Sequence, residues 1–500
     1  MNNIQFPKFW PVTQNSNFVS QGTTFFALKG KNFNGLDFIE DALKKGADKI
    51  ITDQEILPEL ENLISSYNAK LVKVKNGLVE LSKSAAKSLN FPAQKLKILG
   101  VTGTKGKTTT TFLLHHILKS LGFKAAMISG VKNIINDTEF KSELTTPHAD
   151  YIQTFLATCV ENQIEYIVME VSAQALTLHR VDEIEFNGII FTNLSQEHAE
   201  FYSSIEKYFE AKEILFSKLK SGAPAVVNIF DEFGIRLHKK YRPFSLGYSN
   251  SDFQIKNISS DFGGIKFEID IRSLLKFASH PSTSSGRAAA RGEPVEPYER
   301  FLKKKFSINI VSKLIGKFNA INCADAFALS VSLGFDAQKI IKAIENFSGV
   351  PGRMESYKLK SGALGVVDYA HTPSSYIEIL TTLRSLTSNL IVVFGAGGER
   401  DSTKRPVMGK IASEYADKIF ITSDNPRSED ANLIADQIIS GAKSAEKFKK
   451  ELDRELAIKA ACVASKEGSI VAVLGKGPDE YQIIGKNKFF FSDKDTLKSN

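Results

Sequence analysis

The chain has 500 residues, of which 42% are hydrophobic, and this is enough for several packed cores in about three domains of ordinary size. Its three cysteines, Cys159, Cys323 and Cys462, are far apart and form no CxxC pair, which argues against a disulfide framework or a zinc site. The N-terminus has no basic region followed by an apolar core, and no apolar run approaches about 18 residues. We therefore expect a cytoplasmic protein that is neither exported nor membrane-spanning.

The net charge of +8 is unevenly distributed along the chain. Residues 272–305 hold eight Lys or Arg against three Glu, and the centre of this segment, "ASHPSTSSGRAAARGEPVEPYE" (278–299), has almost nothing to bury. This composition predicts a disordered surface insertion at about 278–300. A basic arm that binds nucleic acid is the alternative, but the segment has no platform of interleaved aromatic side chains to stack on bases, so no nucleic-acid partner is expected.

Patterning along the rest of the chain separates three regions. In residues 1–92, the stretch "LDFIEDALKKGADKIITD" predicts an amphipathic helix that ends at Gly46 and leads into a short apolar strand. In residues 93–345, short runs rich in β-branched residues alternate with helical stretches, as expected of buried parallel strands: "LKILGVTG", "YIVMEV", "GIIFTNL" and "APAVVNI".

Residues 346–500 repeat this scheme, and each apolar run is followed by a polar or glycine-rich loop: "ALGVVDYAH", "NLIVVFGAGG", "KIFITSDNP" and "SIVAVLGKG". The sequence therefore predicts an α/β protein of three domains, a small N-terminal one (1–92), a central one with a mostly parallel sheet (93–345) and a C-terminal Rossmann-like one (346–500).

The stretch "GVTGTKGKTTTTFLL" (100–114) lies between an expected strand and an expected helix. The general P-loop pattern has a glycine five positions before Gly106, where this chain has Val101, so that motif is only partly met. The remaining residues are chemically sufficient, since backbone N–H groups of a glycine turn at a helix N-terminus bind phosphate. Lys107 suits the β- and γ-phosphates and the Thr108 hydroxyl suits Mg²⁺. An ordinary glycine-rich turn is the alternative.

Three further residues are weak candidates when each is taken alone. Glu170 ends the run "YIVME" and has the carboxylate needed to hold a nucleotide's metal ion, whereas His198 and Lys212 stand near a loop and on an expected helix. A strand-terminal Glu, a loop His and a helix Lys are more often solvated or structural.

The combination of motifs, in their order along the chain, resembles the Mur ligase family. The resemblance covers nearly all of the chain outside the insertion. It rests on the motifs "GTKGKTT" (103–109), "TTP" (145–147), "MEVSAQAL" (169–176), "FTNLSQEH" (191–198), "EAKEILF" (210–216), "GKFNAINCADA" (316–326), "GVPGRME" (349–355), "VDYAHTP" (367–373), "FGAGGERDSTKRPVMG" (394–409), "TSDNPRSED" (422–430) and "GKGPDEYQ" (475–482).

This resemblance implies a UDP-substrate-binding N-terminal domain, a P-loop-type ATPase domain and a C-terminal domain that brings the incoming amino acid. It implies the member that adds the third residue of the peptidoglycan stem in the cytoplasm. ATP would phosphorylate the D-glutamate γ-carboxylate of UDP-N-acetylmuramoyl-L-alanyl-D-glutamate, and the amine of the added residue would displace the phosphate. ATP and Mg²⁺ are the implied cofactors, and a monomer is expected.

For catalysis the resemblance implies Lys107, His198 and a carbamylated Lys212, whose modification would convert an ammonium into an oxygen ligand. The implied metal contacts are Thr108, Glu170, His198 and Lys212. The implied ATP-binding residues are Gly103, Thr104, Lys105, Gly106, Lys107, Thr108 and Thr109 of the loop, with Asn322 at adenine, Arg353 at the phosphates, Asp368 at the ribose and His371 nearby.

On the UDP-substrate side the matching residues are hydroxyls and an arginine, which suit a diphosphate and a carboxylate: Ser16, Thr145, Thr146, Ser172 and Arg180. This region departs from the family pattern. The family's "DSR" is "NSN" (15–17), the Asn before the threonine pair is Leu144, and the Gln two places before Arg180 is Leu178. The departures leave the ATPase residues intact and change the expected UDP-peptide contacts.

For the incoming amino acid, "DNPR" (424–427) resembles the family signature for meso-diaminopimelate, which ends in a carboxylate that lysine lacks. The implied amino-acid-binding residues are Arg400, Asp424, Asn425, Pro426, Arg427, Gly475 and Asp479. Arg427 has the planar donors for that carboxylate, although a turn with a solvent-facing arginine is the alternative for a tetrapeptide alone. The family's "GKGHE" is "GKGPD" here, so Asp479 is one methylene shorter than the usual Glu.

Other functions remain open at this stage. The same ligation with L-lysine, another Mur ligase and a folylpolyglutamate-type ligase would share the ATPase core. A P-loop switch or a nucleic-acid-dependent ATPase belongs to a different class and would form no amide.

Overall fold

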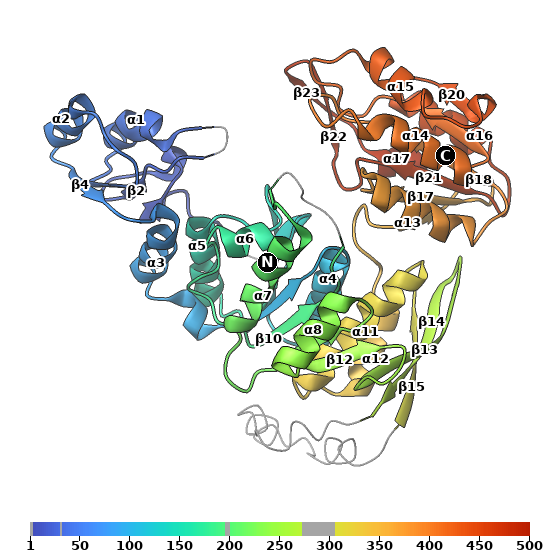
Figure 1. The fold of residues 1–500 in the computed structure, drawn as a ribbon, viewed down its shortest axis with the longest axis horizontal. Helices are drawn as coiled ribbons and strands as arrows, with labels where there is room; N and C mark the ends of the chain where they lie inside the picture. The colour runs from blue at the N-terminus through green and yellow to red at the C-terminus, as the bar shows by residue number, and fades with distance from the viewer. Residues whose placement is uncertain (1–3, 31–32, 196–200, 273–305) are drawn as a thin grey trace. The chain divides into compact units, whose positions relative to one another are not determined.

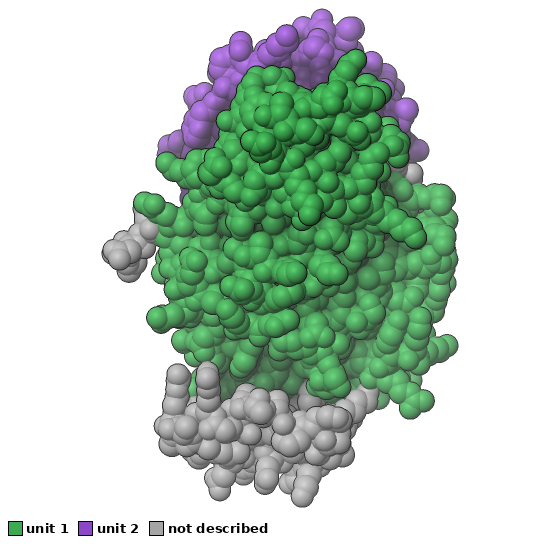
Figure 2. Space-filling view, turned by 90° about the vertical axis from the view of Figure 1, so that its left-hand side faces the viewer, with its two compact units in different colours: residues 1–256, 268–310, 321–344 green, residues 257–267, 311–320, 345–500 purple. Residues whose placement is uncertain are grey.

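The structure, a computed structural model, describes residues 4–30, 33–195, 201–272 and 306–500 (Figure 1). The predicted insertion at about 278–300 and the predicted site residue His198 lie outside the described residues. The chain divides into two compact units, which Figure 2 colours separately: unit 1 is residues 1–256, 268–310 and 321–344, and unit 2 is residues 257–267, 311–320 and 345–500. Among the described residues, no helix has the length and the apolar character needed to cross a membrane.

Unit 1 begins with a four-stranded parallel sheet in the order β1-β2-β3-β4. Its strands are β1 (Val12–Thr13), β2 (Thr24–Phe26), β3 (Lys49–Thr52) and β4 (Lys70–Lys73), and its helices are α1 (Ile39–Lys44), α2 (Pro58–Ser66) and α3 (Gly77–Ser88). Neighbouring residues of β2 face opposite sides: Phe25 packs with α1 and α2, and Phe26 packs with α3. The predicted helix ending at Gly46 is α1, and it leads into β3 as expected.

The central sheet has eleven strands in the order β15-β14-β13-β12-β11-β10-β5-β9-β6-β7-β8. Neighbouring strands from β6 to β13 in this order are parallel, whereas β7 and β8 are added antiparallel at one end. The strands are β5 (Lys97–Thr102), β6 (Ala125–Ile128), β7 (Lys132–Ile135), β8 (Thr138–Lys141), β9 (Tyr166–Glu170), β10 (Gly188–Phe191), β11 (Ala225–Asn228), β12 (Phe244–Gly247), β13 (Phe253–Asp261), β14 (Gly264–Ile271) and β15 (Phe306–Ser312). The helices are α4 (Lys107–Ser120), α5 (Ala149–Glu161), α6 (Ala173–Thr177), α7 (Ile205–Ser217), α8 (Glu232–Tyr241), α11 (Lys317–Ser332) and α12 (Ala337–Asn346).

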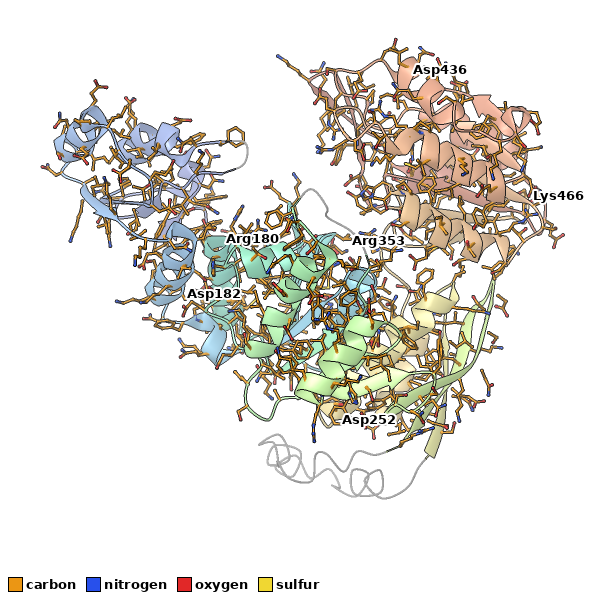
Figure 3. The ribbon with its side chains drawn as sticks, viewed as in Figure 1. Arg180, Asp182, Asp252, Arg353, Asp436 and Lys466 are labelled. Atoms are coloured by element: carbon orange, nitrogen blue, oxygen red, sulfur yellow. The ribbon has the colours of Figure 1, made fainter. Side chains whose placement is uncertain are left out.

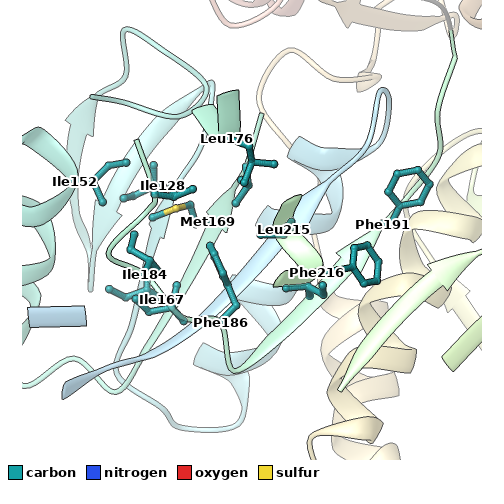
Figure 4. Close-up of a cluster of buried hydrophobic side chains, with 14 of the residues drawn as sticks. Ile128, Ile152, Ile167, Met169, Leu176, Ile184, Phe186, Phe191, Leu215 and Phe216 are labelled. Atoms are coloured by element: carbon teal, nitrogen blue, oxygen red, sulfur yellow. The ribbon is translucent and has the colours of Figure 1, made fainter. Parts of the chain in front are cut away.

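The six parallel strands β5, β6, β9, β10, β11 and β12 are buried because helices cover both faces of the sheet, and this explains their uninterrupted apolar sequences. Figure 4 shows part of this core, in which Ile128, Ile167 and Met169 of the sheet pack with Phe186 and with Leu215 of α7. A Cβ added at Gly100 of β5 would lie 2.8 Å from the Phe186 ring, so the glycine lets this ring pack directly on the strand.

Unit 2 contains a six-stranded sheet in the order β16-β17-β21-β18-β19-β20, parallel except for β16. The strands are β16 (Glu355–Lys358), β17 (Leu364–Asp368), β18 (Leu390–Phe394), β19 (Lys418–Ile421), β20 (Phe448–Lys450) and β21 (Ile470–Leu474), and a separate antiparallel pair is β22 (Tyr481–Ile484) with β23 (Asn487–Phe490). The helices are α13 (Pro373–Arg384), α14 (Lys404–Tyr415), α15 (Ala431–Ile439), α16 (Arg454–Val463) and α17 (Asp493–Lys498). Val392 packs with α13, α14 and α15, and Val393 packs with α16 and α17, so this sheet too lies between two helix layers.

The predicted α/β class with mostly parallel sheets is confirmed. The eight apolar runs singled out in residues 93–500 form β5, β9, β10, β11, β17, β18, β19 and β21. The boundaries of three domains at 92 and 345 stay a prediction.

A fully buried ion pair holds the carboxyl ends of two strands in unit 2. Arg454 at the start of α16 donates to both carboxylate oxygens of Asp493, over 2.6 and 2.7 Å, and to the Leu474 carbonyl at the end of β21 over 3.0 Å. Its remaining nitrogen lies 3.4 Å from the Ser423 carbonyl, just after β19. The pair therefore joins α16, α17 and the loops that follow β19 and β21.

We predict that Asp493→Asn destabilises unit 2 by about 3 to 5 kcal/mol, because it leaves the buried Arg454 guanidinium without its counter-charge. Hydrogen exchange of β21 amides under native conditions measures this loss. Glu455→Gln is the matched control, since it breaks the exposed pair of Glu455 with Lys459 on the same helix and should leave exchange unchanged. Equal exchange rates in wild type and Asp493→Asn would contradict the assignment.

Candidate active site

The phosphate loop, residues 103–106, connects β5 to α4 in unit 1. Gly103 has φ 141° and Gly106, the N-cap of α4, has φ 83°, and both values favour glycine. A Cβ at Gly103 would lie 2.0 Å from the Thr192 hydroxyl, so the close approach also requires a hydrogen in place of a side chain. The first turn of α4, whose N–H groups cannot bond within the helix, follows directly, and the loop thus has the local structure of an anion site.

Two lysines converge on one carbonyl of this loop. Lys107 Nζ donates to the Gly103 carbonyl over 3.0 Å and to the Thr104 carbonyl over 2.8 Å. Lys212 Nζ, from α7, donates to the same Gly103 carbonyl over 2.6 Å and lies 4.4 Å from the centre of the Tyr208 ring. Lys212 is only 1% exposed, so it is not a solvated lysine on a helix surface, which was the alternative from the sequence. Two positive groups thus lie at the phosphate loop.

The segment after β10 holds the loop in place. Thr192 donates to the Lys105 carbonyl over 2.6 Å, and Asn193 Oδ1 accepts from the Lys105 N–H over 2.9 Å. Thr104 is held on both sides: its N–H donates to the Asn193 carbonyl over 2.8 Å, and its hydroxyl accepts from the Ser195 N–H over 3.1 Å. Sequence reasoning singled out only His198 in "FTNLSQEH" and missed these residues. The signal available in the sequence was that Thr192 and Asn193 directly follow the apolar run of β10, the strand that pairs with β5.

Hard oxygen donors stand beside the loop. The Thr108 hydroxyl donates to Glu170 Oε2 over 3.2 Å, and Glu170 Oε1 accepts from the Gly130 N–H over 3.0 Å. Glu170 is 1% exposed, which excludes the solvated carboxylate of the alternative reading. Among the described residues no three His, Cys, Asp or Glu side chains form a metal-binding group. A hydroxyl and one carboxylate fit Mg²⁺, which takes few protein ligands and completes its shell with water and phosphate.

Asn322 of α11 approaches the loop from another direction. A Cβ at Gly106 would lie 2.4 Å from Asn322 Oδ1, so the amide lies against the N-terminus of α4. The structure therefore brings Asn322 together with the loop, Lys107, Thr108 and Glu170. Thr109 is half-buried in the first turn of α4.

Three of the five residues predicted for the UDP substrate form one hydrogen-bonded group. Thr146 donates to the Glu170 carbonyl over 2.8 Å and contacts the Ser172 hydroxyl at 3.3 Å, while Arg180 (labelled in Figure 3) donates to the Thr146 carbonyl over 2.7 Å. Arg180 is 9% exposed, and burial lowers its pKa. The fourth, Thr145, precedes this group and lies near Gly130, whose added Cβ would be 3.2 Å from the Thr145 hydroxyl.

Ser16 lies between strands β1 and β2 of the N-terminal sheet. It starts the short 3-10 helix Ser16–Phe18, and its carbonyl accepts from Lys45 Nζ over 3.1 Å. No hydrogen bond among the described residues joins Ser16 to Thr146, Ser172 or Arg180.

In unit 2, the residues predicted for the nucleotide follow α12 and β17. Arg353 (labelled in Figure 3) lies 4.7 Å from the centre of the Tyr369 ring. Asp368 is buried at the end of β17, where its carboxylate accepts from the N–H groups of Met354 (2.8 Å) and Ala370 (2.7 Å). Burial raises the pKa of Asp368, against the opposing effects of Arg353 and the two N–H groups.

His371 follows in the same loop as Asp368. Its Nδ1 lies 2.8 Å from the Tyr369 carbonyl, and its own carbonyl accepts from Lys404 Nζ over 2.9 Å. Arg353, Asp368 and His371 thus share one part of unit 2 with the ring of Tyr369.

The loop after β19 carries Arg427 in the left-handed region, with φ 53°. Its N–H donates to the Ile483 carbonyl over 3.1 Å, and its carbonyl accepts from Gly485 over 2.8 Å, so β22 fixes the backbone. Its guanidinium donates to the Gly398 carbonyl over 2.6 Å. Asn425 Oδ1 accepts from the Ile483 N–H over 2.8 Å. The arginine is half-buried and held, unlike the solvent-facing arginine of the alternative reading.

Residues of two further loops meet this one. A Cβ at Gly475, which has φ 110°, would lie 3.1 Å from Asp424 Oδ2. The Pro426 carbonyl would lie 1.9 Å from a Cβ at Gly398, so the glycine loop after β18 passes directly over it. Arg400, in that loop, is exposed. Asp479 is half-buried, and burial raises its pKa although Lys476 acts in the opposite direction.

Two buried cations that the sequence did not single out support these loops. Lys476 Nζ, with its side chain fully covered, lies 3.4 Å from Asp424 Oδ1 and 3.3 Å from Asn425 Oδ1, and burial lowers its pKa. Arg405 donates to Glu429 over 2.8 Å and to the Gly397 carbonyl over 3.0 Å. Both lie within quoted motifs, but only the fold shows that they are buried and what they contact.

Comparison with known proteins identifies similar chains. Three family models match: "Mur ligase family, catalytic domain" over residues 11–87, "Mur ligase middle domain" over 101–330, and "Mur ligase, glutamate ligase domain" over 352–477. A relative from Clostridium tetani, named UDP-N-acetylmuramoyl-L-alanyl-D-glutamate–2,6-diaminopimelate ligase, is 34% identical over 495 residues, which is 97% of this chain and 93% of the relative. A protein of the same name from Aquifex aeolicus is 35% identical over 489 residues, 97% of this chain and 92% of the relative.

Solved structures of similar fold include Mur ligases. One described as UDP-N-acetylmuramoyl-L-alanyl-D-glutamate–2,6-diaminopimelate ligase has a TM-score of 0.65 and 27% identity, covering 100% of this chain and 96% of that chain. The MurF ligase of Thermotoga maritima in complex with ADP has a TM-score of 0.62 and 21% identity, covering 95% of each chain, and this likeness is one of fold.

We predict that Gly106→Ala weakens ATP binding, by about tenfold, because the new methyl group displaces either the loop or the Asn322 amide. Gly122→Ala is its matched control: Gly122 follows the other end of α4 with φ 86°, and nothing lies within 4 Å of an added Cβ. Both variants should lose about 1 kcal/mol of stability from the left-handed backbone. Calorimetric titration with ATP separates them, and equal affinities would contradict the proposed site.

Proposed function

Because the chain belongs to the Mur ligase family, we propose that it joins meso-diaminopimelate to the D-glutamate γ-carboxylate of UDP-N-acetylmuramoyl-L-alanyl-D-glutamate, with ATP as the energy source. The geometry that supports this best is the phosphate loop with Lys107 and Lys212 on one carbonyl, beside Thr108 and Glu170. A γ-phosphate and a substrate carboxylate repel each other, so a site that joins them needs concentrated positive charge.

The proposed reaction has two steps. A γ-carboxylate oxygen of the dipeptide attacks the γ-phosphorus of ATP, and ADP leaves, which gives an acyl phosphate. The amine of meso-diaminopimelate then attacks the acyl carbon, loses a proton, and the tetrahedral intermediate releases inorganic phosphate to leave an amide. The activation is needed because phosphate is a far better leaving group than the oxygen of a carboxylate.

Within this proposal Lys107 turns from the loop carbonyls to the transferring phosphoryl group, whose developing charge it stabilises. Thr108 and Glu170 are the described residues that would hold Mg²⁺, which supplies charge neutralisation on the phosphates. Carbamylation of Lys212 would replace a buried ammonium by an anionic oxygen donor at the same place. His198 as a further ligand stays a prediction.

For the nucleotide, the roles of Asn322, Arg353, Asp368 and His371 stay predictions from the resemblance. For the UDP-peptide, Thr146, Ser172 and Arg180 form a ready group of hydroxyls and a guanidinium, and we include Ser16 and Thr145 in the same proposal. A monomer in the cytoplasm, without nucleic acid or membrane partners, completes it.

Mass spectrometry of the product tests the proposal directly. The protein is incubated with ATP, Mg²⁺, the UDP-dipeptide and either meso-diaminopimelate or L-lysine. We expect one amide of meso-diaminopimelate for each phosphate released. If the lysine product formed in preference, L-lysine would take the place of meso-diaminopimelate in the proposal. ATP hydrolysis that is stimulated by nucleic acid and gives no amide would overturn the ligase assignment.

We predict that Lys107→Ala lowers kcat by at least about 10²-fold while the fold is kept, since a charge on the transferring phosphoryl group is lost. Steady-state release of phosphate measures the change. Lys119→Ala is the control, because Lys119 lies at the far end of the same helix in an exposed pair with Asp137 and should have no effect. Near-normal ligation by Lys107→Ala would refute the role.

We predict that Arg427→Ala removes most of the preference for meso-diaminopimelate over L-lysine, by about tenfold or more in the ratio of kcat/KM, because the distal carboxylate loses its partner. Arg427→Asn repeats the test with a residue that tolerates the left-handed backbone. The control is Arg384→Ala, which removes an exposed arginine paired with Asp417 in the same unit. An unchanged ratio in both Arg427 variants would exclude Arg427 as the specificity residue.

A further inference from the structure

Asp325 is a buried acidic residue that the proposed reaction does not use. It lies in α11 and is 0% exposed. Within the described part of the chain, its side chain has one hydrogen bond, which comes from a neutral group: Asn228 Nδ2, at the end of β11, donates over 3.1 Å to Asp325 Oδ2. Burial raises the pKa of Asp325 well above its usual value, only this N–H acts against it, and no described Lys, Arg, His or acidic side chain takes part.

The hydrogen bonding around Asp325 lacks one donor. Asp325 Oδ1 and Asn228 Oδ1 are both buried acceptors that no described group donates to. Asn228 cannot supply the donor, since its amide N–H groups go to Asp325 and, over 2.6 Å, to the Thr192 carbonyl. A proton on the carboxyl turns Asp325 into a donor, and Asn228 Oδ1, on its existing partner, is a buried acceptor to which no described group donates.

The same contacts lead to the phosphate loop. Asn228 holds the Thr192 carbonyl, the Thr192 hydroxyl holds the Lys105 carbonyl over 2.6 Å, and Gly103 is in close contact with that hydroxyl. One turn before Asp325, the same helix presents Asn322 to Gly106. Helix α11 thus contacts Gly106 through Asn322 and is linked to Gly103 through Asn228 and Thr192.

We propose that Asp325 carries its proton in the folded protein and, through Asn228 and Thr192, is a positioning residue for the phosphate loop. Loss of this proton places an unmatched charge in the core and takes away the donor to Asn228. The loop is then held by a weakened chain of contacts. The part that concerns nucleotide rests on the proposed binding of ATP at this loop.

The pH dependence follows from the raised pKa. An acid whose pKa is higher in the folded than in the unfolded state stabilises the fold fully below the unfolded value of about 4, and this stabilisation is lost as the pH rises toward the folded value. Asp325→Asn keeps a donor and an acceptor and cannot ionise. Relative to this variant, the unfolding constant of the wild type should rise by up to tenfold for each pH unit in that range.

The test uses the full chain and three variants. Unfolding in urea from pH 5 to 9 is expected to show a shallower alkaline loss in Asp325→Asn, and infrared difference spectra between the two proteins at pH 7 should show a protonated carboxyl band in the wild type only. Neither measurement depends on which substrates the protein joins. A carboxylate band in the wild type, or a variant less stable than the wild type at every pH, would overturn the protonation.

Calorimetric titration with ATP tests the positioning role. Asp325→Asn should bind ATP within about twofold of the wild type, whereas Asp325→Leu, which leaves Asn228 without its donor and acceptor, should bind about tenfold more weakly. Ser332→Ala, a buried polar residue two turns along α11, is the control and should leave ATP affinity unchanged. Equal affinities for Asp325→Leu and Asp325→Asn would show that Asp325 does not act on the loop.

Discussion

The Gly103 carbonyl, with two lysine ammonium groups directed at it, is the interaction on which the candidate active site depends. A left-handed glycine is needed for the carbonyl to point there, and a residue without Cβ is needed for Thr192 to pack against it. Because β5 lies between β9 and β10, the loop, Glu170 and Thr192 all arise at one edge of the sheet. Parallel strand order therefore determines which side chains can meet a phosphate bound at the proposed site.

In unit 2, buried cations hold the loops that follow the strands. Arg454 with Asp493, Arg405 with Glu429, and Lys476 near Asp424 each place a cation under a loop that follows a strand. Such pairs contribute little net stability compared with apolar packing, but they fix the loops in one arrangement because a displaced partner leaves a charge in the interior. The loops after β18, β19 and β21 are thereby held together, which suits a site that must distinguish one amino acid from another.

Local pattern was enough to predict eight strands in residues 93–500 and a glycine turn between β5 and α4, because β-branched runs, glycines and a helix start can each be recognised within a few residues. The antiparallel β7 and β8 have only four residues each, β8 is half exposed, and neither has a long apolar run, so they were not predicted. The residues that hold the loop were missed for another reason. Thr192 and Lys105, and Asn228 and Asp325, are 87 and 97 positions apart, and only the folded chain brings them into contact.

The two cations proposed to act on substrates, Lys107 and Arg427, share one arrangement. Each donates to backbone carbonyls, of Gly103 and Gly398 respectively, in a loop that contains glycine. A backbone carbonyl accepts from the cation's N–H groups but does not neutralise its charge. When the cation moves from the carbonyl to a phosphate or a carboxylate, it gains a charge-assisted hydrogen bond. The carbonyl that it leaves is neutral and needs only a new hydrogen bond to water. For Arg427, a buried carboxylate in place of the Gly398 carbonyl would be left as an unpaired anion by the same exchange. This arrangement lets the proposed sites form before substrate binds, and it still favours an anion when substrate arrives.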